Sequence, residues 1–323
     1  MKRIFALSMA LVVVLAVAGC GKAAPTAAPE AGPRTIRIAM VNFSLCCPYF
    51  IGMSKAVEEE AAYYSNIELI ITDANGDAEK LTSDVDDVLA QKVDGIIVSG
   101  AWLEAAPAAL DAIKAAGVPV VMVDRLLKGG DYTSWVGPNN YQIGEQDGQY
   151  IVDRLGGKGL LVVLRGGPAD NSIGLDRTNG MLSKVQASSI QVETAPDFGG
   201  WSSDGGFTLM EDMLARFDKI DAVFCENDSM CLGAQKAIAD AGRSSEMFLV
   251  GVDGEKAALE NIMAEGSNYA ATGLNNSDQI GRAAFHRLIA ILLGATPPHD
   301  TVLPSPLITI DNVYRHYNPD SVF

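Results

Sequence analysis

The segment from Val118 to Val123 is the feature that most restricts the fold of this chain. It reads Val-Pro-Val-Val-Met-Val, and it is bounded by Gly117 and by the charged pair Asp124 and Arg125. A continuous apolar run is typical of a strand that is buried on both faces, as in a parallel sheet covered by helices above and below. Ligands of such sheets bind outside the carboxyl ends of the strands, so we expect Asp124 and Arg125 to face a crevice.

Apolar runs and amphipathic helix patterns alternate from Thr35 to Leu293. Each succession of strand, helix and strand needs a crossover, which favours parallel strands. The pattern restarts after Arg125, so we predict an α/β fold with two lobes, each a doubly wound parallel sheet. The predicted strands are 36–41, 67–72, 95–99, 118–123, 159–164, 190–195, 222–225, 248–252 and 269–272. The predicted helices are 52–64, 77–91, 107–116, 141–155, about 177–186, 205–217, 232–241, 255–265 and 277–293.

Residues 1–19 have the pattern of a secretory signal. Lys2 and Arg3 precede an apolar segment that is too short for a comfortable transmembrane span. Cys20 follows Ala-Gly, an arrangement that resembles the bacterial lipobox and implies an exported lipoprotein that is anchored through lipidated Cys20. An ordinary signal followed by an incidental cysteine is the alternative. Residues 20–34 are rich in Ala, Pro and Gly and are expected to form a flexible tether.

Composition excludes several kinds of partner. The 323 residues carry a net charge of −16, which would repel a phosphate backbone, so no nucleic-acid partner is expected. Besides Cys20 the chain has cysteines at positions 46, 47, 225 and 231, and their spacing suggests neither a dense disulfide framework nor a zinc site. We therefore predict no metal and no cofactor.

No combination of residues typical of an enzyme is found. The chain has only three histidines, His286, His299 and His316, and none follows a nucleophile pattern. The Gly-x-Ser-x-Gly elbow, the phosphate-binding loop and the His-Glu-x-x-His motif do not occur. Without a nucleophile, a base and a group that orients the base, we predict a binding protein rather than an enzyme.

Polar and aromatic residues instead follow the predicted strands. Carboxylates, amides and guanidinium groups pair with hydroxyl groups, and aromatic rings cover apolar C–H faces, so these residue types indicate a sugar or polyol site. The residues concerned are Phe43, Cys47, Tyr49 and Phe50 after the first strand, Asp124 and Arg125 after the fourth, and Asn227, Asp253 and Asn275 after later strands.

At these residues the chain resembles the bacterial periplasmic sugar-binding proteins of the ribose-binding type, the substrate-binding components of ABC importers. The resemblance extends from Ile36 to about Leu293 and implies the type I periplasmic binding protein fold, in which a three-stranded hinge joins the lobes. It is carried by colinear blocks at 120–125, 222–233 with Asn-Asp-x-Met-x-Leu-Gly, 249–254, and 270–281 with Asp-Gln-Ile-Gly.

The resemblance also implies which residues contact the ligand. Phe43 and Cys47 occupy positions where the ribose type has serine and asparagine, which removes two hydrogen-bonding groups and argues against ribose itself. We therefore expect a deoxy sugar, a different pentose or hexose, or a polyol. The family's sugar contacts fall on Asp124, Arg125, Arg177, Trp201, Asn227, Asp253 and Asn275, and its aromatic pair falls on Tyr49 and Phe50.

The lobes implied by the resemblance are discontinuous in sequence. The first would contain residues 35–138 and 276–303, and the second would contain residues 139–275 and 304–323. The hinge crossings are expected near 138–140, 275–276 and 303–305. Pro297, Pro298, Pro304 and Pro306 restrict the strands of the tail to short or edge positions, and we expect the tail to cross between the lobes.

Structural explanations compete with the proposed ligand contacts. Asp124 and Arg125 could form an ion pair at a strand end. Asp253 could belong to a plain turn, and Trp201 could fill a gap between lobes.

Two further expectations concern helix starts. Between Asn227 and Asp228, we expect Asp228 to cap the following helix and Asn227 to face the ligand. We expect Arg177 to open a helix, where the dipole disfavours a cation, so that a ligand role explains it better.

The adjacent cysteines Cys46 and Cys47 are unusual. In an exported protein they could form a vicinal disulfide that presents a flat sulfur face to the ligand; two free thiols, one of them buried, are the alternative. Cys225 and Cys231 are expected to be small core residues with free thiols.

The prediction is an exported, lipid-anchored, monomeric protein that binds a monosaccharide or polyol between its lobes, closes by hinge motion and docks on an ABC permease. A receptor for a furanose-like autoinducer, or a sugar-sensing signalling protein, is the alternative. The effector domains of lac-repressor-type transcription factors share the two-lobed build. Here, however, a signal and a tether stand where those proteins carry a DNA-binding headpiece.

Overall fold

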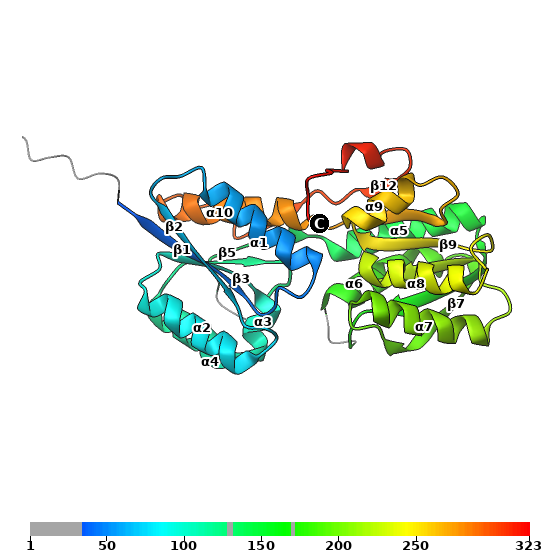
Figure 1. The fold of residues 1–323 in the computed structure, drawn as a ribbon, viewed down its shortest axis with the longest axis horizontal. Coiled ribbons are helices and arrows are strands. Elements are labelled where there is room, and N and C mark those ends of the chain that lie inside the picture. Colours follow the sequence, from blue (N-terminus) through cyan, green and yellow to red (C-terminus); the bar gives the residue numbers. More distant parts are fainter. Residues whose placement is uncertain (1–33, 128–131, 169–171) are drawn as a thin grey trace, which may run out of the picture. The chain divides into compact units, whose positions relative to one another are not determined.

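The computed structural model describes residues 34–127, 132–168 and 172–323. The predicted signal, Cys20 and nearly all of the tether lie outside these ranges. Within them the chain forms two six-stranded sheets, sheet A and sheet B, with helices packed around each (Figure 1). This arrangement confirms the predicted fold class.

Sheet A is entirely parallel, with the strand order β11-β5-β4-β3-β1-β2. Its strands are β1 (Ile36–Asn42), β2 (Ile67–Asp73), β3 (Gly95–Ser99), β4 (Val120–Val123), β5 (Ser134–Pro138) and β11 (Asp300–Leu303). The helices that pack with it are α1 (Pro48–Ala61), α2 (Ala78–Ala90), α3 (Gly100–Ala105), α4 (Pro107–Ala116) and α10 (Ser277–Leu292).

Helices cover both faces of sheet A because successive side chains of a strand point to opposite sides. Ile38 and Met40 of β1 pack with α1 and α10, whereas Ala39 and Val41 pack with α2 and α4. This double burial explains why β3 and β4 have continuous apolar sequences rather than an alternating pattern.

Sheet B has the order β12-β10-β9-β8-β6-β7, and only β12 is antiparallel to its neighbour. One face packs on α7, α8 and α9, and the other packs on α5 and α6. Its strands are β6 (Lys158–Arg165), β7 (Ser189–Phe198), β8 (Ala222–Cys225), β9 (Phe248–Asp253), β10 (Tyr269–Leu274) and β12 (Leu307–Thr309). Its helices are α5 (Asn140–Leu155), α6 (Ser172–Val185), α7 (Ser203–Arg216), α8 (Asp228–Asp240) and α9 (Lys256–Met263), and a short helix η1 (Val313–Arg315) follows β12.

The chain passes between the two sheets three times. It leaves sheet A between β5 and α5, returns between β10 and α10, and leaves again between β11 and β12. At the third crossing the Gln146 amide donates to the carbonyl of Ser305 and accepts from the amide of Leu307. The first and third crossings therefore lie side by side, because Gln146 belongs to α5, the helix that follows the first crossing.

Two elements on the sheet A side, β5 and α3, were not predicted from the sequence, and β11 was expected only as a short or edge strand of the tail. Strand β5 reads Ser-Trp-Val-Gly-Pro, which is neither an apolar run nor an alternating pattern. It is a strand because it pairs with both β4 and β11, and because the Trp135 indole donates to the carbonyl of Asp124. Helix α3 is too short for its pattern to be recognised.

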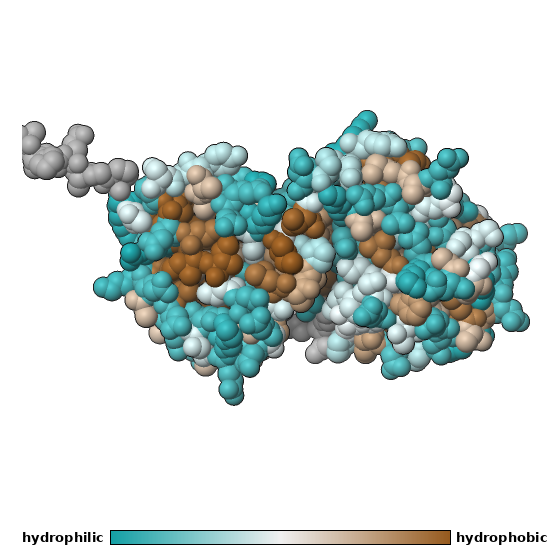
Figure 2. Space-filling view, in the orientation of Figure 1, coloured by the Kyte–Doolittle hydropathy of each residue, from teal (hydrophilic) through white to brown (hydrophobic). Residues whose placement is uncertain are grey.

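Strand β2 is an edge of sheet A, and each of its residues is half-buried or exposed where the sequence suggests a covered strand. Figure 2 shows apolar residues gathered over this edge. Ile67, Leu69 and Ile71 line a groove there together with residues of α1 and with Tyr64. No helix within the described ranges has the length and apolarity that crossing a bilayer requires.

Cys225 and Cys231 form a disulfide, so the prediction of two free thiols is wrong. Both residues are fully buried in the core on the α8 side of sheet B, as expected. Cys225 ends β8 and Cys231 lies in the first turn of α8. The tight turn between these elements brings the two Cα atoms to 5.4 Å, within the range that a disulfide requires.

Candidate functional site

The carboxyl ends of strands from both sheets border a cavity of about 610 Å³, a size typical of small-molecule sites. Phe43 does not line it, because its ring packs against the core beneath α2 and α4. The other predicted ligand-binding residues all do: Cys47, Tyr49, Phe50, Asp124, Arg125, Arg177, Trp201, Asn227, Asp253 and Asn275.

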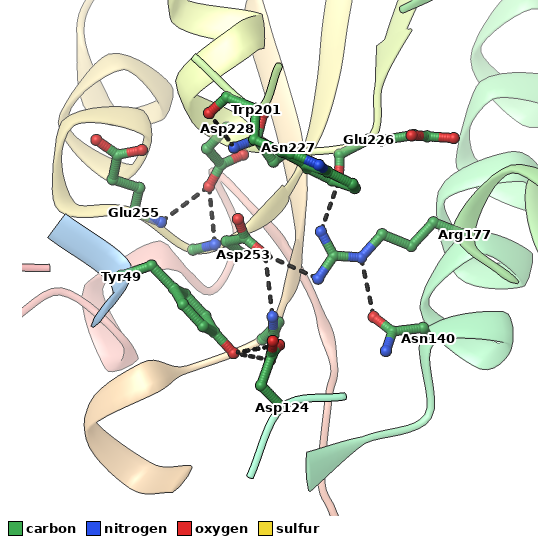
Figure 3. A network of polar contacts seen from close by, with 12 residues as sticks. Tyr49, Asp124, Asn140, Arg177, Trp201, Glu226, Asn227, Asp228, Asp253 and Glu255 are labelled. Carbon is green, nitrogen blue, oxygen red and sulfur yellow. Dashed lines mark hydrogen bonds and ion pairs between the residues drawn. The ribbon is translucent and has the colours of Figure 1, made fainter. Parts of the chain in front are cut away.

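Arg177 is the centre of a buried polar network on the sheet B side (Figure 3). Only 2% of the residue is exposed. Its Nη2 lies 2.9 Å from Oδ1 of Asp253, its Nε donates to Oδ1 of Asn140, and its Nη1 donates to the carbonyl of Glu226. Each nitrogen of the guanidinium therefore has a partner, which fixes the position of the Arg177 side chain. The ion pair with this fixed group in turn orients the Asp253 carboxylate.

The position of Arg177 in its helix differs from the prediction. Helix α6 begins at Ser172, so Arg177 lies in the second turn rather than at the start. The helix dipole therefore has little effect on Arg177, contrary to the prediction, because the dipole acts mainly within the first turn. What explains a cation here is the ion pair with Asp253.

Tyr49 joins this network from the sheet A side. Its hydroxyl lies 3.1 Å from Oδ1 of Asp124 and 3.2 Å from Oδ1 of Asn275. The Asn275 amide donates to Oδ1 of Asp253, which also pairs with Arg177. Groups from both sheets thus form one continuous set of hydrogen bonds along the cavity wall (Figure 3).

Burial controls the ionisation of these groups. It raises the pKa of Asp253 to about 7, although the charge of Arg177 opposes the shift. Burial likewise raises the pKa of Asp124 and holds the pKa of Tyr49 well above its ordinary value. Near neutral pH Asp253 therefore exchanges between a carboxylate, which only accepts hydrogen bonds, and an acid that can also donate.

Backbone strain is concentrated at the cavity. Five residues other than glycine have positive φ in the described ranges, and two of them, Asn75 and Lys92, lie in exposed turns. The others are Asp124 (φ 60°), Trp201 (φ 62°) and Asp253 (φ 127°), all of which line the cavity. Each such conformation costs ~1–3 kcal/mol and is typical of functional sites, where it aims side chains that ordinary backbone would direct elsewhere.

Aromatic side chains provide the apolar part of the wall. The Tyr49 and Phe50 rings meet edge to face, with their centroids 5.1 Å apart. The Arg125 guanidinium lies 5.7 Å from the centre of the Trp201 ring, so these residues from the two sheets form a cation–π contact. A ligand between them would meet both an apolar face and a cation.

Asn227 lines the cavity, as predicted, but it also takes the capping role that was predicted for Asp228. Asn227 is the cap of α8, because its Oδ1 accepts from the amide of Met230, and its amide group also donates to the carbonyl of Trp201. Asp228 is fully buried, and its Oδ2 accepts from the amides of Gly254 and Glu255. The expectation that Asp228 caps the helix is therefore wrong, and Asp228 instead fixes the loop that carries Asp253.

Sequence reasoning missed several lining residues. Ser229 donates to Glu255, and both border the cavity. Glu255 follows a strand end and could have been found by the rule that identified Asp253. Phe323 also lines the cavity, and nothing in the local sequence indicates this. In the described part of the chain, no three His, Cys, Asp or Glu side chains are grouped so as to hold a metal ion.

Cys46 and Cys47 are two separate thiols with their sulfurs 3.4 Å apart, so the hypothesised vicinal disulfide is not formed in this structure. Cys46 is exposed and Cys47 is half-buried, and both line the cavity. A hydrogen bond from the Cys47 thiol stabilises the Cys46 thiolate and lowers the pKa of Cys46 to about 6. The same interaction, together with burial, raises the pKa of Cys47.

This arrangement predicts unequal reactivity of the two thiols. In protein with both cysteines reduced, Cys46 should react with iodoacetamide well before Cys47 at pH 7, because only the thiolate is nucleophilic. The Cys46 rate should rise through a midpoint near pH 6, the value set by its pKa. Peptide mass spectrometry of timed reactions between pH 5 and pH 9 measures both rates. In Cys47→Ala, which lacks the donor, the midpoint should move up; an unchanged midpoint would contradict the assigned hydrogen bond.

Comparison with known proteins identifies the class to which this fold and site belong. The family model described as "Periplasmic binding protein domain" matches residues 38–296, and the chain belongs to this family. Its members bind solutes and are not enzymes, and membership implies export to the periplasm. The predicted resemblance is therefore confirmed.

Individual relatives match most of the chain. The xylitol-binding protein of Mycolicibacterium smegmatis is 32% identical over 313 residues, which cover 96% of this chain and 86% of the relative. The ribose import binding protein RbsB of Bacillus subtilis is 32% identical over 247 residues, covering 76% and 78%. A solved ABC transporter solute-binding protein from Mycobacterium smegmatis, with bound glycerol, superposes with a TM-score of 0.81 at 28% identity and covers 89% of this chain and 98% of that one.

Proposed function

We propose that this protein is the extracytoplasmic substrate-binding component of an ABC importer for a polyol or monosaccharide. The observation that carries the proposal is the convergence of Arg177, Asp253 and Asn275 with Tyr49 and Asp124 on one cavity. A ligand with adjacent hydroxyl groups can donate to the carboxylates and accept from the guanidinium and amide. Aromatic rings would cover its C–H groups.

A linear polyol fits this wall better than ribose. The loop that opens α1 presents Cys46, Cys47 and Phe50 to the cavity and so offers few strong hydrogen-bonding groups. The relative that matches this chain over 96% of its length is named a xylitol-binding protein. The cavity wall has hydrogen-bonding groups in two places, one around Arg177 and one around Asp124. This arrangement suits a ligand with hydroxyl groups along an extended carbon chain.

Transport would depend on hinge motion of the two lobes, 35–138 with 276–303 and 139–275 with 304–323. The crossings between the sheets are the candidate hinges. Tyr49 and Asp124 belong to one lobe, and Arg177 and Asp253 to the other, so a ligand that bonds to both stabilises the closed form. The closed form would dock on the permease.

Anchoring through lipidated Cys20 is part of the proposal. The sequence around Cys20 supports it, and the Cys225–Cys231 disulfide supports an oxidising compartment outside the cytosol. The described lobes begin directly after the proposed tether, which would leave them free to close at the membrane surface.

A ligand screen by thermal unfolding tests the proposal. Xylitol, glycerol, D-ribose and a deoxy sugar are added separately, and xylitol is expected to give the largest rise in Tm. A ligand at ~100 times its Kd adds ~2.7 kcal/mol to the free energy of unfolding. The rise should vanish in Asp253→Asn and persist in Asp212→Asn, the same change at an exposed position of α7. No rise with any sugar or polyol would overturn the proposed function.

A further inference from the structure

The segment 318–323 runs from the sheet B side of the molecule to the sheet A side. It follows η1, which packs against α9, and the Lys256 ammonium of α9 donates to the carbonyls of Pro319 and Ser321. Beyond that point the Ser321 hydroxyl donates to Oδ2 of Asp278 in α10, at 2.8 Å. The segment is thus fastened to helices of both sheets, whereas sequence reasoning placed it in the second lobe alone.

Phe323, at the end of this segment, is 94% buried against α1, since only 6% of it is exposed. A Cβ atom added at Gly52 of α1 would lie 2.8 Å from the Phe323 Cβ, closer than real Cβ contacts. Because glycine has no side chain, Gly52 leaves room for Phe323 to pack against α1. This close packing indicates that Phe323 has a defined binding position on α1.

The Phe323 ring also contacts the ligand cavity. It lines the cavity, and it meets the Tyr49 ring edge to face with the centroids 5.4 Å apart. Phe50 packs on the same Tyr49 ring at 5.1 Å. Two rings therefore hold Tyr49 in the orientation in which its hydroxyl reaches Asp124 and Asn275.

We infer that Phe323 is a ligand-binding residue and that segment 318–323 is a strap which fastens it into the cavity wall. The inference rests on the proposed function. The Phe323 ring supplies an apolar wall for the C–H groups of a polyol, and it positions the Tyr49 hydroxyl for the polar side of the same ligand. The Lys256 and Ser321 contacts hold the strap across both lobes.

Isothermal titration of the full chain with xylitol and with D-ribose tests the ligand role. In Phe323→Ala the affinity should fall roughly ten-fold, the size expected for loss of an aromatic contact, and Phe323→Leu should lose less. Tyr314→Ala is the matched control, because Tyr314 is an aromatic residue close by in sequence that is 71% exposed. If Phe323→Ala binds as tightly as Tyr314→Ala, the ligand role is overturned.

A ligand-free measurement separates the strap from the proposed function. In Asp278→Cys with Ser321→Cys, oxidation should link the two positions, and peptide mapping distinguishes this link from pairing with Cys46 or Cys47. Absence of the link overturns the strap. If the wild type binds neither these probes nor any other sugar or polyol of the unfolding screen, the proposed function fails and the ligand role of Phe323 fails with it. The link between positions 278 and 321 still decides whether the strap docks.

Discussion

Replacing Arg177 with methionine is expected to lower the free energy of unfolding by ~3–5 kcal/mol, because removing one partner of a buried ion pair leaves the other uncompensated. Methionine has a similar length but no donor. The change would leave the Asp253 carboxylate, Oδ1 of Asn140 and the Glu226 carbonyl without their bonds to the guanidinium. Ligand binding should be lost in the same variant.

The loss of unfolding free energy in Arg177→Met should depend on pH. Arg177 opposes the effect of burial on Asp253, so its removal raises the pKa of Asp253 further above the value of about 7. A carboxyl group whose pKa is raised by folding stabilises the fold at low pH and loses that contribution as the pH rises. The destabilisation measured by urea unfolding should therefore be larger at pH 8 than at pH 5.

Arg216→Met is the matched control for this experiment. Arg216 also lies on a helix and pairs with a carboxylate, Asp212, but 44% of its side chain is exposed. Its replacement should change stability by no more than ~0.5 kcal/mol. Equal losses in the two variants would show that the buried network does not stabilise the fold.

Replacing Asp147 with asparagine is expected to stabilise the protein at neutral pH. Asp147 of α5 is fully buried, and neither of its carboxyl oxygens has a hydrogen-bond partner in the described residues. Both oxygens lie against β10, 3.0 Å and 3.2 Å from where a Cβ of Gly273 would be. Burial, with repulsion from Asp228, raises the pKa of Asp147 well above its ordinary value.

The sign of the pH effect follows from this shift. The unfolded chain ionises Asp147 near pH ~3.9, and each pH unit above that costs the fold ~1.4 kcal/mol until the raised pKa is reached. Asparagine removes this cost, so the variant should match the wild type near pH ~4 and exceed its unfolding free energy increasingly as the pH rises, by up to ~1.4 kcal/mol per pH unit.

Urea unfolding from pH 4 to pH 8 measures the Asp147 effect. Asp153→Asn is the control, since Asp153 lies on the same helix but is exposed and accepts a bond from Gln149. If the unfolding free energies of Asp147→Asn and the wild type differ by the same amount at every pH, the stabilisation does not come from removing the ionisation of Asp147.

Local patterns in the sequence were sufficient for the fold class and for eight of the residues that line the cavity, whereas Arg177 and Trp201 were assigned from the family resemblance. The apolar run ending at Val123 required a doubly covered strand, and parallel strands place their carboxyl ends on one edge. Asp124, Asn227 and Asp253 could therefore be assigned to one crevice before any contact was known. The same rule did not separate Phe43, which is half-buried and packs against the core, from its neighbours in the same loop.

The contacts within the site could not be predicted in the same way. The cap at Asn227 and the Cys225–Cys231 disulfide depend on the geometry of one turn, which composition does not specify. The unpaired carboxyl group of Asp147 depends on how α5 meets β10. Asn and Asp side chains can cap a helix, bond to a nearby loop or face a ligand, and the tertiary surroundings decide which of these they do.

The sequence by itself determined most of the strands and helices, that the predicted strands are parallel, and that polar side chains gather at their ends, because periodicity and strand burial act over a few neighbouring residues. The tertiary structure alone decided that Tyr49 meets Asn275, 226 positions away, and that Phe323 closes the wall beside it. Such contacts arise from the packing of two sheets between which the chain passes three times. The pattern of neighbouring residues does not predict that packing.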